Sequence, residues 1–401
     1  MYENLSILAA FVFLYSVVAG RLERTPINGA LVFTAFGLAL GPMGIDLLHL
    51  NVDTEGLRSL AELTLALVLF TDASNANLGV LERSIRIPRR LLLIGLPLTI
   101  LLGFGVGVIM FHDLGLLEIA ILATMLAPTD AALGKAVVTA ESVPPKIREG
   151  LNVESGLNDG ICVPILFVFL ALVADATAHD RTGALALHLL AEEIGIGVAV
   201  GIGLTLVGAW LLKLCVDRGW VTETWRQLPV VALATACFAL AQTLGGSGFI
   251  AAFAGGLLFG WSTKSHKHAL LLAAEGTGDT LALLTWVVFG AAVVGQAVRG
   301  FSWAVVLYAL LSLTLIRMLP VFLALSGTGL RKDEKLFMGW FGPRGLASIV
   351  FIVIVLGESL PGAQTLTSIV VCTVVLSIIG HGLSANPLVA ALARRRKSTS
   401  L

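Results

Sequence analysis

Four polar residues lie close together inside an apolar run of the chain at 148–174. They are Glu154, Ser155, Asn158 and Asp159. In a helix, Ser155 and Asp159 are four residues apart and share one face, and Glu154 and Asn158 share the adjacent face. A charge at the centre of a bilayer costs at least about 2.5 kcal/mol, so acids inside such a run need a partner or a ligand. We expect the first pair to offer oxygen atoms to a cation and the second pair to hold the structure together.

Two other apolar runs are interrupted by proline. The interruptions read Ala127-Pro128-Thr129-Asp130 and Phe341-Gly342-Pro343-Arg344-Gly345. Proline cannot donate to the helical ladder, and unwound backbone within a bilayer has to line a polar cavity. Asp130 would supply a second carboxylate there, and Thr129 a hydroxyl or carbonyl oxygen. Because hard cations prefer oxygen ligands, the sequence predicts a Na+ site at Asp130, Ser155 and Asp159.

This set of residues suits ion exchange. A carboxyl group that is partly removed from water and close to a second acid titrates nearer neutral pH, so a cation and a proton can compete for it. If the site moves across the membrane only when one of them is bound, the two flows are coupled. The alternative is that salt bridges neutralise the acids, which then only lock helices together.

Three other charged residues fall within apolar runs. Arg317 needs a buried anion, and we expect Glu154 to be that partner. Arg344 could either compensate the exposed carbonyls of the interrupted helix or contact the ion. Asp72 could line the cavity as an outer ion ligand or lie near a helix end and face water.

The whole composition indicates an integral membrane protein. Of the 401 residues, 57% are hydrophobic and 13% are charged, the formal net charge is zero, and mean hydropathy is +0.94. Apolar runs of about 17–25 residues, enough for a helix to cross a bilayer, recur along the chain. We expect thirteen spans and no strands. They lie at about 5–21, 27–42, 57–77, 90–111, 115–138, 148–174, 185–216, 227–244, 247–261, 275–297, 302–325, 334–357 and 364–384.

The spans divide into two halves. Without the run at 185–216, six remain on each side, and the interruptions fall in the fifth member of each six. Matching interruptions indicate inverted repeats with broken helices that cross at mid-membrane. We expect one transmembrane domain over 1–401, with repeat one at about 5–174, repeat two at about 227–384 and a short basic tail at 385–401. The first run lacks the features of a signal peptide, so we expect it to be retained.

The basic residues predict the orientation. Twenty Lys and Arg residues fall on one side of the expected spans, whereas only Arg181 and Arg299 fall on the other. The positive-inside rule then places the N-terminus outside and the C-terminus in the cytoplasm. Glu275 and Asp279, four residues apart, would lie near the cytoplasmic start of their span, where a preference for negative charge at a helix N-terminus explains them.

On these motifs the chain resembles the monovalent cation-proton antiporters, and is similar to the NhaP-type sodium-proton exchangers of prokaryotes. The resemblance covers nearly the whole chain. It implies that Asp159 carries the cation and the proton in turn, with ligands at Asp130, Ser155 and the Thr129 backbone, and that Asp72 can join them. It implies a structural ion pair between the residues at 154 and 317.

The resemblance also bears on stoichiometry and assembly. Asn158, rather than a second acid before Asp159, is typical of electroneutral members that exchange one cation for one proton. The family forms homodimers in the cell membrane, in which a six-helix core moves against a dimerisation domain. That core would comprise spans four to six and eleven to thirteen here. One departure is Asp72, where several relatives carry glutamate.

Three alternatives remain open. The same architecture could carry K+ or Li+ instead of Na+, because selectivity depends on cavity size and ligand number. Paired acids could serve an intramembrane enzyme, although the spans hold no activated nucleophile or histidine cluster. A carrier for anions or organic solutes could use Arg344. We expect no cofactor, and with basic residues spread along the chain, no nucleic-acid partner.

Overall fold

The computed structural model describes residues 2–22, 25, 28–48, 54–75, 86–130, 133–177, 183–222, 224–225, 228–263, 267–358 and 360–399, which form helices and no strands. Five of the basic residues used for the orientation lie outside these ranges, namely Arg24, Arg83, Arg181, Arg226 and Lys264.

The first half contains α1 (Tyr2–Leu22), α2 (Gly29–Leu40), α3 (Thr54–Asn75), α5 (Arg86–Arg90), a π-helical turn (Leu91–Gly95), α6 (Leu96–Met110), α7 (Leu116–Met125), α8 (Lys135–Val138) and α9 (Pro145–Thr177). The linking helix is α10 (Gly183–Asp217). The second half contains α11 (Leu228–Thr243), α12 (Gly248–Ser262), α13 (Lys267–Val288), a π-helical turn (Phe289–Val294), α14 (Gly295–Ala297), a 3-10 turn (Val298–Gly300), α15 (Trp303–Leu313), α16 (Leu315–Ala324), α17 (Lys332–Trp340), α18 (Leu346–Gly357) and α19 (Ala363–Thr399).

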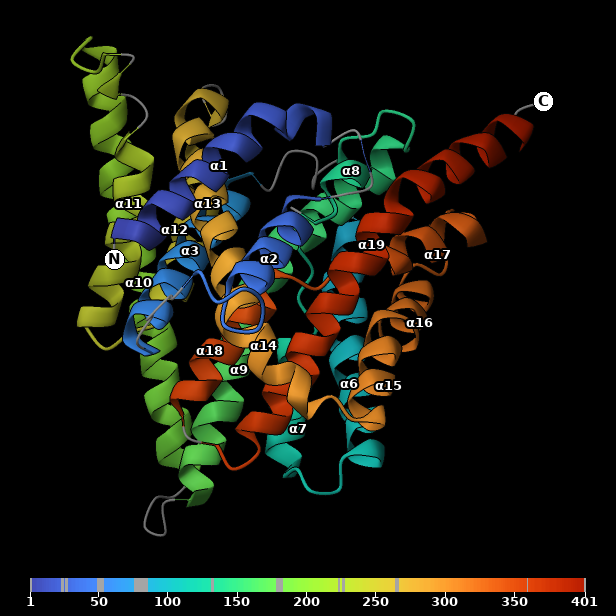
Figure 1. Ribbon diagram of the computed structural model, residues 1–401. Helices are drawn as coiled ribbons and strands as arrows, with labels where there is room; N and C mark the ends of the chain where they lie inside the picture. The colour runs from blue at the N-terminus through green and yellow to red at the C-terminus, as the bar shows by residue number, and fades with distance from the viewer. Residues whose placement is uncertain are drawn as a thin grey trace.

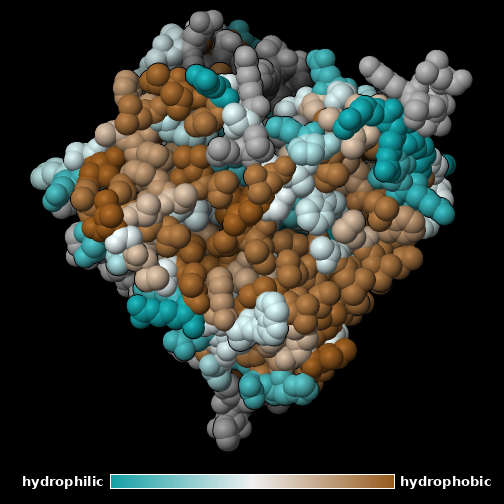
Figure 2. All heavy atoms as spheres, turned by 45° about the vertical axis from the view of Figure 1, so that its right-hand side comes forward, coloured by the Kyte–Doolittle hydropathy of each residue, from teal (hydrophilic) through white to brown (hydrophobic). Residues whose placement is uncertain are grey.

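The helices confirm the all-α membrane fold. In the described residues, seven helical segments are long and apolar enough to cross a membrane, and five shorter apolar helices accompany them. With α3, which is too polar to count among the seven, these account for the thirteen expected spans. Figure 2 shows hydrophobic residues across the middle of one face and hydrophilic residues gathered toward its upper and lower ends.

Two helices run further than the hydropathy pattern indicates. Since α13 begins at Lys267, Glu275 and Asp279 lie well inside the helix, and a preference for acids at its N-terminus does not explain them. The side chain of Asn75 donates to Glu275 Oε1 at 2.6 Å. Residues 385–399, expected as a tail, continue α19 past its neighbours toward the C-terminus (Figure 1).

Glycines allow two helix pairs to pack closely at corresponding places in the two halves. A Cβ at Gly37 of α2 would overlap with the backbone oxygen of Val287 in α13. Likewise, a Cβ at Gly256 of α12 would overlap with the backbone oxygen of Phe70 in α3. Each contact pairs the second span of one half with the third span of the other. Such crosswise pairing is expected of two inverted repeats.

The two interrupted spans cross in the interior. The first span leaves α7 at Met125 and continues as non-helical chain to Asp130, and the second is unwound between α17 and α18. At the crossing, Asp130 N donates to Pro343 O at 2.8 Å. Helix α18 is apolar all round and is buried from Leu346 to Val355, as expected of a helix enclosed by others.

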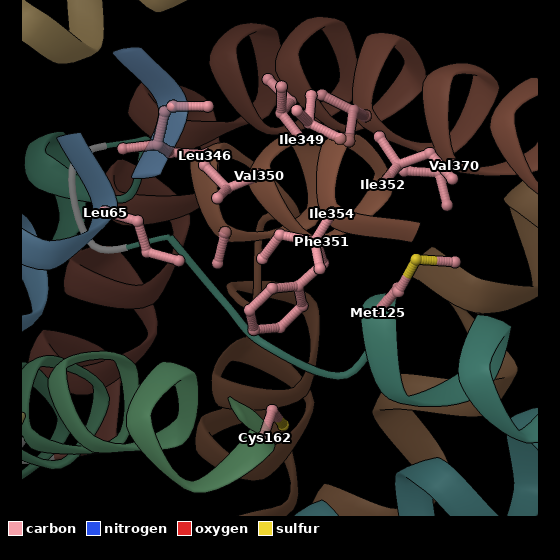
Figure 3. Packing of buried hydrophobic residues seen from close by; sticks show 14 of the residues in the cluster. Leu65, Met125, Cys162, Leu346, Ile349, Val350, Phe351, Ile352, Ile354 and Val370 are labelled. Carbon is pink, nitrogen blue, oxygen red and sulfur yellow. The ribbon is translucent and has the colours of Figure 1, made fainter. Parts of the chain in front are cut away.

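The packing around α18 joins helices from both halves. Figure 3 shows Phe351 of α18 near Cys162 of α9, with Met125 of α7 and Val370 of α19 beside the same helix. The four belong to one continuous cluster of buried hydrophobic residues. The apolar core therefore holds both broken spans in place around their polar crossing.

Candidate ion-binding site

Asp130 caps the second broken helix. Its Oδ2 accepts a hydrogen bond from Leu346 N at 2.9 Å, and its Oδ1 accepts one from Leu133 N at 3.2 Å. The carboxylate therefore lies at the N-terminus of α18, where unpaired N–H groups and the helix dipole favour negative charge. Gly345 makes this approach possible, because a Cβ there would overlap with the carboxylate.

Arg344 donates to carbonyl oxygens just beyond the C-terminal end of α7, whereas Asp130 accepts from backbone N–H groups. The Arg344 side chain is fully buried, and Nη1 donates to Ala127 O and, at 3.0 Å, to Pro128 O. Nearby, Ser348 Oγ donates to Met125 O at 2.8 Å. These donors satisfy carbonyls that the interrupted helix leaves without partners, which is the structural alternative considered for Arg344.

Helix α9 is tied to the first interruption through Thr129. Ser155 Oγ donates to the backbone oxygen of Thr129, and Asn158 Nδ2 donates to Thr129 Oγ1 at 2.7 Å. Thus the structure brings together Thr129, Asp130, Ser155 and Asn158, from two spans. It brings Asp159 to the same face of α9 as Ser155, one helical turn further on.

Asp159 has a buried oxygen without a hydrogen-bond donor. The residue is 8% exposed, and among the described residues its Oδ1 has no hydrogen-bond partner. The Oδ1 of Asn158 is buried and unpartnered in the same way. Burying polar oxygen without compensation costs roughly 1–3 kcal/mol, and most buried polar atoms in proteins are paired. Two such oxygens on successive residues are therefore suited to a positively charged ligand.

Asp72 approaches from another helix. It is partly exposed, and its backbone oxygen would lie 3.3 Å from a Cβ at Gly156, so α3 packs directly on this part of α9. The charges of Asp72 and Asp130 both act on Asp159, and those of Glu275 and Asp279 act on Asp72. Within the described structure, however, no hydrogen bond joins Asp72 to another site residue.

Glu154 forms a buried ion pair with Arg317. Its two oxygens accept hydrogen bonds from Arg317 Nη1 and Nη2 at 2.6 and 2.7 Å, and both side chains are 1% exposed. This bidentate pair joins α9 to α16. The guanidinium also lies against the second interruption, because a Cβ at Gly342 would overlap with Arg317 Nε. Glu154 therefore holds structure and leaves Asp159 as the carboxylate of this cluster without such a partner.

A small cavity adjoins the crossing. It measures about 10 Å³, close to the room that one water molecule needs, and Thr129, Asp130, Ser155, Phe341 and Pro343 are among its lining residues. Thus three of the four proposed ligand residues in this region face one space. Asp159 is not among the lining residues.

Sequence reasoning missed two polar residues of this region. Ser377 Oγ accepts a hydrogen bond from Arg344 N at 2.7 Å, and His381 Nε2 lies 2.8 Å from Trp340 O. Both come from α19. A histidine four residues after a serine inside an apolar run was a usable signal, because ionisable residues within spans rarely lack a function.

Comparisons with known proteins show the family of the chain. Residues 7–391 match the family described as sodium/hydrogen exchanger, transmembrane. A K(+)/H(+) antiporter NhaP2 of Shewanella sp. (strain ANA-3) is 24% identical over 383 residues, which are 94% of this chain and 64% of that protein. A Na(+)/H(+) antiporter of Schizosaccharomyces pombe is 25% identical over 317 residues, 71% of this chain and 67% of that protein.

A solved structure supports the fold independently. The sodium proton antiporter MjNhaP1 from Methanocaldococcus jannaschii superposes with a TM-score of 0.76 at 21% identity, covering 98% of this chain and 99% of that one. The chain spans less than two thirds of the Shewanella protein's length, but it corresponds to the transporter structure almost end to end. The chain therefore belongs to the sodium/hydrogen exchanger family of multi-pass membrane transporters.

Proposed function

We propose that the protein exchanges a monovalent cation for a proton across the cell membrane, with Asp159 as the group for which the two compete. The observation that carries this proposal is the buried Oδ1 of Asp159, which has no hydrogen-bond donor among the described residues. A bound cation or a proton would each compensate that oxygen. Because one cannot occupy it while the other is there, the two flows are coupled as long as the site changes sides only when one of them is bound.

The ligand set follows from the atoms around the crossing. Asp159 supplies the charge, and Ser155 Oγ and the Thr129 carbonyl supply neutral oxygens, since each has lone pairs beyond those used in their mutual hydrogen bond. Asp130 contributes from the N-terminus of α18 while its oxygens remain held by backbone donors. Asp72 joins the set only if its side chain turns toward α9.

The exchange is electroneutral in this proposal. Arg317 neutralises Glu154, and Asn158 carries no charge, so Asp159 is the one carboxylate in the 154–159 cluster left to titrate or to bind a cation. One monovalent cation or one proton then restores neutrality. This supports a stoichiometry of one to one.

Movement of the site is supported by how the helices contact one another. Polar side chains join α7, α9, α16, α18 and α19, which all belong to the proposed moving core of spans four to six and eleven to thirteen. By contrast, α9 meets α3 and α12 through Gly156 and Gly160, where Asp72 and Phe253 pack closely. In the part of the chain that the structure describes, no hydrogen bond joins α9 to α3 or α12, and such a contact allows one group of helices to slide past the other. We place the homodimer contact on the group that does not move, with the N-terminus outside and the C-terminus in the cytoplasm.

The transported ion is Na+ in this proposal, with Li+ as a close substitute. Na+ is the first candidate because the matching family is described as sodium/hydrogen exchanger and the Schizosaccharomyces relative is named a Na(+)/H(+) antiporter. K+ is the second candidate, because the Shewanella relative is named a K(+)/H(+) antiporter. The order of activity with Na+, Li+ and K+ separates these two assignments.

The test uses purified protein in vesicles with an internal proton gradient and a pH-reporting dye. Adding Na+, Li+, K+ or choline chloride between about pH 6 and 9 should dissipate the gradient with the transported ions only, since working carboxyls titrate near operating pH. Asp159→Asn should abolish the signal while the protein remains folded. Glu192→Gln, which changes an exposed acid on α10, is the matched control. Wild-type flux from Asp159→Asn, or no cation-evoked flux from the wild type, would refute the proposal.

A further inference from the structure

Three polar side chains on one face of α19 contact the interruption between α17 and α18. Ser377, His381 and Ser384 are spaced four and three residues apart, so they share a face. Ser377 Oγ accepts from Arg344 N at 2.7 Å, and Ser384 Oγ accepts from Trp340 Nε1 at 2.8 Å. His381 Nε2 lies 2.8 Å from Trp340 O, and Nδ1 lies 3.1 Å from Ser377 Oγ and 2.9 Å from Ser377 O. With the hydrogen on Nε2, the ring donates to Trp340 O, and its Nδ1 accepts from the Ser377 hydroxyl.

Two of these backbone groups, Arg344 N and Trp340 O, are the donor and the acceptor of one helical hydrogen bond that the interruption removes. In a continuous helix, Arg344 N would donate to Trp340 O four residues earlier. Here Arg344 N donates to Ser377 instead, and Trp340 O accepts from His381 and from Gly342 N. Two residues of α19, one turn apart, therefore replace the donor and the acceptor that the interruption separates.

This replacement has consequences for the proposed ligands. Reforming the bond between Arg344 N and Trp340 O would rewind residues 341–344. Rewinding would withdraw Pro343 O from Asp130 N, and Leu346 N from the Asp130 carboxylate. It would also displace the Arg344 side chain from Ala127 O and Pro128 O, on which the position of Thr129 depends.

The other repeat uses the same spacing for a different purpose. On α9, Ser155 holds the first interruption at Thr129, and four residues later stands Asp159 with its unpartnered oxygen. On α19, Ser377 holds the second interruption, and four residues later stands His381, which is 1% exposed and bonded to backbone. One repeat presents a group that can take a ligand, and the other presents a group already engaged by the chain.

We infer that Ser377 and His381 form a clamp that keeps the second interruption unwound, and that His381 is a positioning residue for the cation site. The role of the clamp in transport rests on the proposed function. The clamp itself is a statement about the backbone between Trp340 and Arg344. It acts through the contacts of Pro343, Arg344 and Leu346 with the 127–130 segment.

Two substitutions at His381 separate positioning from bulk packing. His381→Met fills the space without a donor, whereas His381→Gln keeps an amide N–H close to the place of Nε2. Losing a buried hydrogen-bond partner typically changes an equilibrium by about tenfold or more. We therefore expect His381→Met to raise the KM for the cation by about tenfold with little change in maximal rate. His381→Gln should restore most of the wild-type KM.

Hydrogen exchange of residues 336–346 is the second readout and needs no transport. His381→Met should accelerate exchange there by about tenfold, and His381→Gln should accelerate it much less. If His381→Met does not fold, Ser377→Ala takes its place, with Ser368→Ala as control, because among the described residues the Ser368 hydroxyl bonds only Gln364 O of its own helix.

The outcomes decide the inference in each case. Unchanged exchange in the folded His381→Met or Ser377→Ala protein, or a His381→Gln protein no better than His381→Met, overturns the clamp. A KM within about twofold of wild type in a variant whose exchange is accelerated overturns the positioning role. If the wild type moves no cation at all, the proposed function fails, and the exchange data alone still decide whether the clamp exists.

Discussion

A substitution at Glu154 tests quantitatively how much its buried ion pair with Arg317 stabilises the fold. Glu154→Gln keeps the size of the side chain but removes its charge and replaces one acceptor oxygen by an amide. The Arg317 guanidinium, 1% exposed, would then be a buried charge without its counter-ion. Removing one partner of a buried pair typically costs about 3–5 kcal/mol.

The expected change in melting temperature follows from this cost. With the average unfolding entropy of soluble domains, about 2.1 cal/mol/K per residue, a chain of 401 residues loses about 4–6 °C for 3–5 kcal/mol. The measurement is thermal unfolding of the detergent-purified protein. Glu149→Gln is the control, because Glu149 is an exposed acid on the same helix and its loss should leave the melting temperature unchanged.

A double variant tests the reason for the loss. Combining Glu154→Gln with Arg317→Met removes the stranded charge and fills its place with an apolar side chain of similar length. Replacing both members of a buried pair by apolar residues is often close to neutral, but here a buried amide remains at position 154, so part of the lost stability should return. A melting temperature of Glu154→Gln equal to wild type, or a double variant less stable than the single one, would contradict this account.

The remaining substitutions test the Asp130 cap at the crossing and the Glu118 cap at the start of α7. Gly345→Ala should lower the melting temperature and raise the KM for the cation, because a Cβ there overlaps with the Asp130 carboxylate. Gly105→Ala, at a helical glycine with no atom within 4 Å of the new Cβ, should do neither. Equal behaviour of the two alanine variants would show that the Asp130 cap is not sterically dependent on Gly345. Glu118→Ala should lower the melting temperature by about 2 °C, since Glu118 accepts hydrogen bonds from Gly115 N at the start of α7 and from Gly362 N before α19, and losing each of the two costs about 1 kcal/mol. A melting temperature unchanged within about 0.5 °C would mean that water replaces both bonds at no cost.

The elements of the fold were largely predictable, and so were some functional roles. Apolar runs and prolines are local properties, so the thirteen spans and both interruptions could be located without a structure. Arg317 could be assigned a buried anion from its isolation in an apolar run, and the structure places Glu154 there. The start of α13 at Lys267 was missed because hydropathy reports the apolar part of a helix and not its polar extension.

The sequence by itself determined that the chain crosses a membrane many times, where its helices are interrupted, and which polar residues inside the spans we propose as ligands of a cation and a proton. Only the tertiary structure decided which contacts each of these residues makes. It engages both oxygens of Asp130 with backbone donors, one of them at the N-terminus of α18, and turns Arg344 onto the carbonyls of 127–128. Among the described residues, it leaves Oδ1 of Asp159 without a donor. It also recruits His381 to a backbone oxygen 41 residues away along the chain. The physical reason is that spans and interruptions depend on residues that are neighbours in the sequence. A run of apolar residues long enough to cross the bilayer makes a span, and a proline interrupts it. A hydrogen bond or ion pair between two broken helices depends on distances of about 3 Å that only packing of the whole chain sets.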